Sequence, residues 1–340
     1  MKKLSHKFRI LSIDGGGIRG IIPGQILVAL EEKLRKATGK PDAAVSDYFD
    51  LIAGTSTGGI LSCALLCPGS DKPRKPRFSA KEVVDLYMER GHEIFSIPVF
   101  HKLRTAFGVL DEKYPSKGIE DALDDYFGDT KLSMMRKPCL IPAYDITRRK
   151  AHFFTSHDAK KDRGKDFLIT DVARATSAAP TYFECVNVKS LTGVSYPLID
   201  GGVFVNNPAL CAYAEAHNKF KVTAKEMLIL SLGTGSVKEE YEYKKARDWS
   251  MIQWLKPLLS IMMSGVSEVV DYQLRQIYSS VKAQKQYLRI DTQLPVTVNH
   301  AMDDATEENR NALKELGTET TQENSSKLNK FVEMMLEESR

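Results

Sequence analysis

Residues 8–20 read FRILSIDGGGIRG, and residues 50–59 read DLIAGTSTGG. Each stretch opens with a short apolar run that stops at glycines, and a helix-like pattern follows each one. After the first, apolar residues recur every four positions from Ile22 to Leu34; after the second, residues 60–66 are almost all apolar. A repeated order of strand, glycine turn and helix is typical of parallel strands joined by crossover helices. We therefore predict an α/β fold.

The rest of the chain extends this pattern. Short apolar runs predict strands, and capping signals or periodic apolar residues predict helices. The expected strands cover 138–145, 152–155, 196–199, 227–232 and 287–290. The expected helices include one opened by a capping box at 79–82, one at 170–179 that Thr170 and Asp171 cap and Pro180 ends, and one at 208–219. Beyond residue 240 the chain is mostly helical, and its 340 residues suit one large domain or two ordinary ones.

Composition excludes several classes of protein. The chain has 48 Lys plus Arg and 44 Asp plus Glu, and a net charge of +4 without a basic stripe does not indicate a nucleic-acid binder. The most apolar long stretch, 251–270, contains Lys256 and Glu268, so we expect no membrane span. No secretory signal is visible, and five cysteines without Cys-x-x-Cys spacing predict a reducing cytosol and no structural zinc.

Ser56 is the candidate nucleophile. It lies at the centre of Gly54-Thr55-Ser56-Thr57-Gly58, which fits the Gly-x-Ser-x-Gly pattern of a nucleophile elbow. That pattern alone is common by chance, but here an apolar run precedes it and a helical run follows it. A sharp turn between a strand and a helix lifts the serine hydroxyl clear of the backbone, and the helix N-terminus stabilises negative charge nearby.

The glycine run at 14–20 has two interpretations. Gly15, Gly17 and Gly20 satisfy the Gly-x-Gly-x-x-Gly fingerprint of a dinucleotide site. That fingerprint also expects an acidic residue ending a second strand, whereas residues 39–42 read GKPD, a loop. The alternative is an oxyanion hole, in which backbone N–H groups of this turn face the oxyanion formed at the serine. Arg19 would then add positive charge or bind a lipid phosphate.

Asp200 is the candidate general base. It ends an apolar run and precedes two glycines. If its strand is parallel to the others, its carboxylate lies at the same edge of the sheet as the serine, where it can take the hydroxyl proton directly. His217 and His300 lie in polar surroundings without a signature, and we interpret them as solvated.

Taken together, three motifs resemble those of the patatin-like phospholipase family: Asp-Gly-Gly-Gly-x-Arg-Gly at 14–20, Gly-Thr-Ser-Thr-Gly at 54–58 and Asp-Gly-Gly at 200–202. The stretches 47–53, 175–180 and 230–235 are similar too. The resemblance implies a three-layer α/β/α fold with a mainly parallel central sheet and a helical C-terminal region. We expect a phospholipase domain at 8–290 and a helical extension at 291–340 packed on it.

The resemblance also implies a serine hydrolase of the phospholipase A type that hydrolyses acyl esters of glycerophospholipids, with no metal, calcium or other cofactor. The residues that it assigns are the nucleophile Ser56, the base Asp200, the oxyanion site Gly15, Gly16, Gly17 and Arg19, and the motif glycines Gly54, Gly58, Gly201 and Gly202. Glycine stands at 202 where many members have alanine, a small departure that leaves the dyad intact.

Partners and regulation follow from the same resemblance. We expect a cytoplasmic protein, a homo-oligomer, that docks peripherally on the inner membrane, using 95–110 or 249–270; for the latter a core or dimer helix is the favoured interpretation. The basic run at 72–77 is interpreted as a solvated loop. The chain also resembles bacterial antiphage phospholipases that a cyclic nucleotide activates. A constitutive lysophospholipase or esterase, a non-catalytic lipid-binding relative and a dinucleotide-binding oxidoreductase are the alternatives.

Overall fold

The computed structural model describes residues 6–94, 116–237 and 241–337. Its strands form one eight-stranded sheet in the order β5-β6-β3-β2-β1-β7-β8, with β4 paired to β3. The strands are β1 (Phe8–Ile13), β2 (Leu51–Gly54), β3 (Cys139–Asp145), β4 (Lys150–Thr155), β5 (Val186–Lys189), β6 (Ser195–Asp200), β7 (Met227–Leu232) and β8 (Tyr287–Ile290). The central strands β3, β2, β1, β7 and β8 are parallel to one another.

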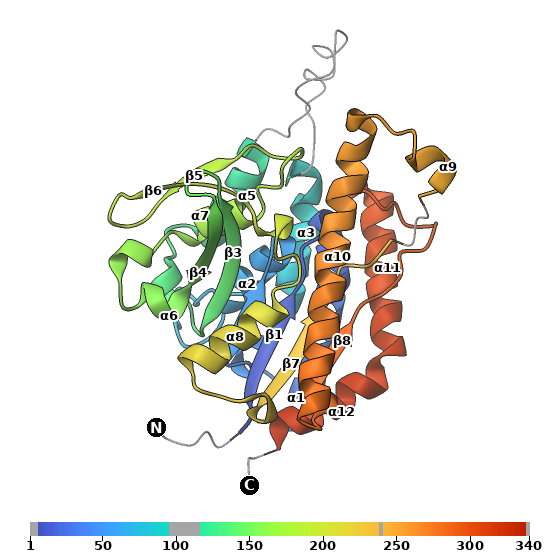
Figure 1. Ribbon diagram of the computed structural model, residues 1–340. Helices are drawn as coiled ribbons and strands as arrows, with labels where there is room; N and C mark the ends of the chain where they lie inside the picture. The colour runs from blue at the N-terminus through green and yellow to red at the C-terminus, as the bar shows by residue number, and fades with distance from the viewer. Residues whose placement is uncertain (1–5, 95–115, 238–240, 338–340) are drawn as a thin grey trace.

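Helices cover both faces of this sheet. They are α1 (Ile21–Thr38), α2 (Thr57–Leu66), α3 (Ala80–Ile94), α5 (Ser116–Phe127), α6 (Ser156–Ala159), α7 (Ile169–Thr176), α8 (Ala209–Lys219), α9 (Tyr243–Ala246), α10 (Met251–Ser280), α11 (Glu307–Glu323) and α12 (Ser325–Leu336). In Figure 1, α8 and α10 lie on the near face of the sheet, and α1, α2 and α3 lie behind it.

Side chains that alternate along the strands form two cores, one on each face. Leu11 belongs to the larger core, with α1, α2 and α7, whereas its neighbour Ile10 belongs to the smaller one, with α8 and the second half of α10. α11 and α12 contribute buried side chains such as Leu313 and Phe331 to the larger core. The predicted three-layer α/β/α fold with a mainly parallel sheet is therefore confirmed.

Three local predictions differ from the structure. α7 begins at Ile169 after Leu168 as its N-cap, so Thr170 and Asp171 lie inside the first turn, and the helix ends at Thr176 before reaching Pro180. The strand β5, which pairs antiparallel with β6, was not predicted. Its four residues alternate between polar and apolar, which is too short a pattern to separate from a loop.

The third difference concerns β6, which we expected to be parallel. It is antiparallel to β3, with Ala143 opposite Asp200. β2 pairs with only the start of β3, at Cys139 and Leu140, so the end of β3 projects beyond β2 and β6 pairs there. β6 thus runs in the direction opposite to the parallel strands, and its last residue, Asp200, lies at their C-terminal edge.

Candidate active site

Ser56 sits at a sharp turn between β2 and α2. Its φ is 54°, in the left-handed region that non-glycine residues seldom adopt. Close approaches on either side leave no room for side chains: a Cβ at Gly54 would lie 2.0 Å from the Gly58 carbonyl oxygen, and one at Gly58 would lie 2.2 Å from that of Ile13. The Gly-x-Ser-x-Gly stretch therefore forms the predicted elbow, and Ser56 precedes the first turn of α2.

The strained backbone of Ser56 is held by α7. The Ser56 N–H donates to the Thr176 hydroxyl at 3.0 Å, and that hydroxyl donates to the Pro142 carbonyl at 2.6 Å. Thr176 is fully buried. The Thr176 side chain thereby links the elbow to β3. The sequence had assigned no role to this residue of the 175–180 stretch.

Replacing Thr176 with valine tests this link. Valine keeps the shape but leaves a buried N–H and a buried carbonyl without partners, so we expect the free energy of unfolding to fall by about 1–3 kcal/mol. Urea unfolding measures the change. Thr176→Ser keeps the hydroxyl and is the control, expected within about 1 kcal/mol of wild type; equal midpoints for the valine variant and wild type would contradict the proposed link.

Asp200 lies beside Ser56. Its carboxylate accepts a hydrogen bond from the Gly202 N–H at 2.6 Å, and both it and Ser56 line the same cavity. Burial raises the pKa of Asp200 to about 7, although the Gly202 N–H and the nearby Ser56 hydroxyl oppose the shift. A carboxylate with a pKa near neutrality, close to a hydroxyl, is suited to act as a general base.

Both side chains face an apolar cavity. Gly16, Gly17 and Gly202 also line it, and its apolar walls include Ile60, Leu86, Ile119, Leu123, Phe183 and Met263. Among the described residues, no histidine lines this cavity. His217 instead bonds the Val222 carbonyl and His300 the Pro295 carbonyl, so within the described chain the aspartate is the basic group next to the serine.

The glycine turn places its amides differently from the prediction. The Gly15 N–H donates to the Asn206 carbonyl at 3.1 Å, so it is not free to bind an oxyanion. In the described chain, the N–H groups of Gly16 and Gly17 have no acceptor. Gly17 needs its glycine, because its φ is 60° and a Cβ there would lie 2.1 Å from the Met302 carbonyl oxygen. Of the three glycine amides predicted to form an oxyanion site, those of Gly16 and Gly17 are therefore the two that remain open to a ligand.

Arg19 lies behind the turn. Its Nε donates to the Gly16 carbonyl at 3.3 Å, and its side chain lines a second, polar cavity of about 350 Å³ instead of the Ser56 cavity. Burial lowers the pKa of Arg19 to about 10, so the guanidinium stays charged at neutral pH. Arg19 does not line the Ser56 cavity, and its predicted role, to add positive charge to the oxyanion site or to bind a lipid phosphate, stays a prediction.

The sequence did not single out Arg289 on β8. Its guanidinium donates to both carboxylate oxygens of Asp14, at 2.8 and 2.7 Å, and to Asp291 at 2.9 Å. Burial raises the pKa of Asp14 to about 6 against the effect of this arginine. An arginine inside a short apolar strand is the signal that could have found it. The ion pair between Arg289 and Asp14 thus holds Asp14, the first residue of the 14–20 motif, in place.

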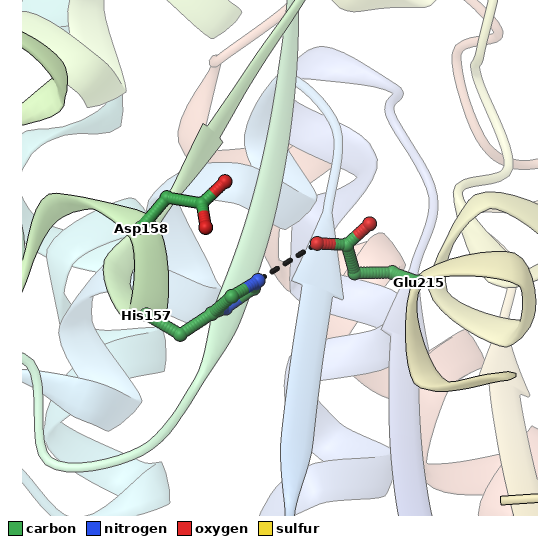
Figure 2. Close-up of side chains that lie close together, drawn as sticks. All are labelled: His157, Asp158 and Glu215. Atoms are coloured by element: carbon green, nitrogen blue, oxygen red, sulfur yellow. Dashed lines mark hydrogen bonds and ion pairs between the residues drawn. The ribbon is translucent and has the colours of Figure 1, made fainter. Parts of the chain in front are cut away.

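Among the described residues, one group of side chains could provide ligands for a metal ion. His157, Asp158 and Glu215 offer ligand atoms within 4.8 Å of one another, on α6 and α8, and Figure 2 shows His157 pointing at Glu215. The His157 Nε2 lies 2.7 Å from Glu215, and Asp158 pairs with Lys219 at 3.1 Å. A cation would have to displace both partners. None of the three lines the Ser56 cavity.

Known proteins resemble this chain over most of its length. The model of the patatin-like phospholipase family matches residues 11–213. Patatin-like protein 2 of Arabidopsis thaliana is 36% identical over 335 residues, which cover 91% of this chain and 82% of that protein. Patatin-like protein 3 of the same plant is 33% identical, covering 94% and 82%. A protein of Solanum tuberosum named probable inactive patatin-3-Kuras 1 is 31% identical, covering 92% and 86%.

The matched region contains the glycine turn, the serine elbow and the Asp200 turn, which the structure brings together around one cavity. β2 ends at Gly54 and continues into the elbow, so it lacks the terminal acidic residue that a dinucleotide site expects. This chain, whose motifs and relatives agree over most of its length, belongs to the patatin-like phospholipase family, which supports a lipid acyl hydrolase activity.

Proposed function

We propose that this protein is a serine hydrolase that releases fatty acid from glycerophospholipids with a Ser56–Asp200 dyad. One observation carries the proposal: Ser56, on a strained elbow, and the buried carboxylate of Asp200 lie together at the wall of one apolar cavity, close enough for the hydroxyl to lower the pKa of Asp200. Because one relative is named probable inactive, the proposal rests on this chain's own residues and not on family membership alone.

In the first half-reaction, Asp200 takes the hydroxyl proton while the Ser56 Oγ forms a bond to the ester carbonyl carbon. The carbonyl oxygen becomes an oxyanion, and the N–H groups of Gly16 and Gly17 donate to it. The positive end of α2 adds to this stabilisation. The intermediate then collapses, the bond between the carbonyl carbon and the glycerol oxygen breaks, and Asp200 gives its proton to the leaving lysolipid alkoxide.

The second half-reaction regenerates the enzyme. Asp200 takes a proton from a water molecule, whose oxygen attacks the acyl-serine carbonyl carbon. A second oxyanion forms at the same amides and collapses with release of the fatty acid, and Ser56 regains its proton from Asp200. The apolar walls around Ile119, Leu123 and Phe183 suit the acyl chain, because they replace its contacts with water.

The decisive assay is release of fatty acid and lysophospholipid from a panel of diacyl phospholipids by wild type and by Ser56→Ala. Hydrolysis of monoacyl lipids or short esters alone would favour the lysophospholipase or esterase alternative. Absence of any product would overturn the proposal. Activation by a cyclic nucleotide, and with it a role in antiphage defence, stays a prediction from sequence resemblance, which the same assay with and without cyclic di- and trinucleotides tests.

Access to membrane lipid is the next requirement. No helix in the described part of the chain is long and apolar enough to cross a bilayer. The first half of α10 nevertheless carries exposed apolar side chains, while its second half buries Val270, Leu274 and Tyr278. Among the described residues of the predicted stretch 249–270 only Val270 is buried, because Leu274 and Tyr278 lie beyond it, so its interpretation as a core or dimer helix stays a prediction. Residues 95–110, the other expected docking segment, lie outside the described residues.

We define the α10 patch as the half-buried Trp249 together with the exposed side chains Tyr241, Tyr243, Met251, Ile252, Trp254, Leu258, Ile261 and Met262. The rings of Trp249 and Trp254 pack at 5.0 Å, and tryptophan and tyrosine favour membrane interfaces. α9 and the start of α10 lie together at the top of Figure 1.

A groove of about 400 Å³ lies between the patch and the catalytic cavity. Tyr241 and Ile261 line this groove together with Tyr182 and Met302. Those last two residues also line the Ser56 cavity. These shared lining residues favour a lipid surface as the partner of the patch. In this proposal the protein docks peripherally on the inner membrane from the cytoplasm.

Placing charges in the patch tests the docking. Ile252→Glu combined with Leu258→Glu is expected to weaken binding to phosphatidylcholine–phosphatidylglycerol vesicles at least about tenfold, because two apolar side chains no longer enter the interface. Vesicle flotation measures this. Hydrolysis of vesicle lipid should fall in parallel, and hydrolysis of a soluble short-chain ester should not.

The matched control is Tyr272→Glu, which changes an exposed residue of α10 about 20 Å along the helix from Leu258. It should bind vesicles as wild type does. A double variant that still floats with vesicles would rule out the patch as the docking surface. If that variant also changes from dimer to monomer in light scattering, the patch binds a second copy, as the homo-oligomer prediction requires.

A further inference from the structure

The side of the glycine turn that faces away from the cavity is held by two side chains. The Thr234 hydroxyl donates to the Gly15 carbonyl at 2.7 Å. The backbone N–H and the Nε of Arg19 each lie 3.3 Å from the Gly16 carbonyl oxygen and donate to it. Both residues are buried, with Thr234 4% and Arg19 8% exposed. The carbonyls of Gly15 and Gly16 thus both accept hydrogen bonds on the side of the turn that faces away from the cavity.

These bonds determine where the amides point. In a trans peptide the C=O of one residue and the N–H of the next point in opposite directions. Because the Gly15 carbonyl points at Thr234, the Gly16 N–H points away from Thr234. Because the Gly16 carbonyl points at Arg19, the Gly17 N–H points away from Arg19. Gly16 and Gly17 line the cavity that contains Ser56 and Asp200, whereas Thr234 and Arg19 line the cavity behind it.

The Gly15–Gly16 peptide needs such a restraint. Glycine on both sides allows the peptide plane to rotate at little steric cost. Thr234 packs closely against Gly16, where a Cβ would lie 2.3 Å from the Thr234 hydroxyl oxygen. The hydrogen bond is what distinguishes the two orientations of the carbonyl.

We propose that Thr234 is a positioning residue for the reaction: its hydroxyl holds the Gly15–Gly16 peptide so that the Gly16 amide faces the oxyanion. This inference rests on the proposed hydrolase function. Thr234 follows β7, in the stretch that resembles the family at 230–235; it does not itself line the catalytic cavity and is linked to it through Gly15 and Gly16. Its effect on the reaction therefore passes through the glycine turn.

The test compares Thr234→Val with Thr234→Ser on a soluble p-nitrophenyl ester. Valine keeps the packing against Gly16 but cannot donate a hydrogen bond, so kcat should fall about 10- to 100-fold while KM stays within about twofold, because the oxyanion exists only after attack. Serine keeps the donor and should restore kcat to within about threefold. Binding of an alkyl trifluoromethyl ketone, which forms an oxyanion on Ser56, should weaken in the valine variant only.

Ser236→Ala is the matched control, because it removes a hydroxyl two residues away that bonds the Thr292 carbonyl instead of the glycine turn. It should leave kcat unchanged. Equal losses in the valine and serine variants, or a wild-type kcat in the valine variant, would overturn the inference while the loss of activity in Ser56→Ala upholds the hydrolase. If wild type shows no hydrolysis at all, the proposed function fails and this inference fails with it.

Discussion

Ser56→Ala is expected to lower fatty-acid release by at least about 10⁴-fold. The variant loses the only atom that forms the bond to the acyl carbon in the proposed mechanism. What remains is the oxyanion site and the apolar cavity, which can hold substrate near water but cannot form the acyl-enzyme. The measurement is product release from phospholipid vesicles, with substrate binding followed separately.

Two results would separate lost chemistry from lost structure. The alanine variant should unfold within about 1 kcal/mol of wild type, because the positive φ at position 56 is retained and only one hydroxyl is lost. Ser280→Ala removes an exposed hydroxyl at the end of α10 and should keep full activity. Wild-type rates in a well-folded Ser56→Ala protein would mean that another residue is the nucleophile.

Asp200→Asn is expected to lower activity by about 10³- to 10⁴-fold, because asparagine cannot take the Ser56 proton. In wild type, kcat/KM should fall below an apparent pKa of about 7, since Asp200 acts only when ionised and burial raises its pKa to about that value. The residual activity of the variant should lack this acidic limb. A wild-type profile that stays flat down to pH 5 would argue against Asp200 as the base.

The same substitution should stabilise the fold. The Asp200 pKa is raised from 3.8 to about 7 in the folded protein, so the folded state holds this proton more tightly than the unfolded state. Wild type consequently loses stability relative to the variant as pH rises from about 4 to 7, by about 2–4 kcal/mol in all. Urea unfolding at pH 4.5 and pH 8 measures this difference. An asparagine variant with low activity and raised stability at pH 8 cannot be explained by misfolding.

The candidate site and the strands around it show which features could be predicted from the sequence. The strand, glycine turn and helix pattern at 8–34 and 50–66 predicted β1, α1, β2 and α2, because local periodicity and glycine spacing are enough to define them. The serine and aspartate turns came from motifs. The sequence did not show that the Gly15 amide bonds the Asn206 carbonyl or that the Arg19 side chain bonds the Gly16 carbonyl, because spacing alone does not identify these partners.

Other features depended on contacts between distant segments. Thr176, Thr234 and Arg289 lie 120, 219 and 275 residues from their partners Ser56, Gly15 and Asp14. No local pattern predicts which carbonyl or amide a threonine will meet. Likewise, the exposed first half of α10, 251–265, has nine apolar residues and the second half, 266–280, has seven, so composition did not reveal that the second half is the one that packs against α8 and β8.

By itself, the sequence determined the α/β class, the elbow at Ser56, the glycine turn and the family, since each depends on residues close together in the chain. The tertiary structure alone decided how Asp200 reaches Ser56. β6 runs opposite to the direction that we predicted, yet it pairs with the part of β3 that extends past β2, so the carboxylate arrives level with the elbow. Strand direction and register are set by long-range pairing, and a motif carries no information about either.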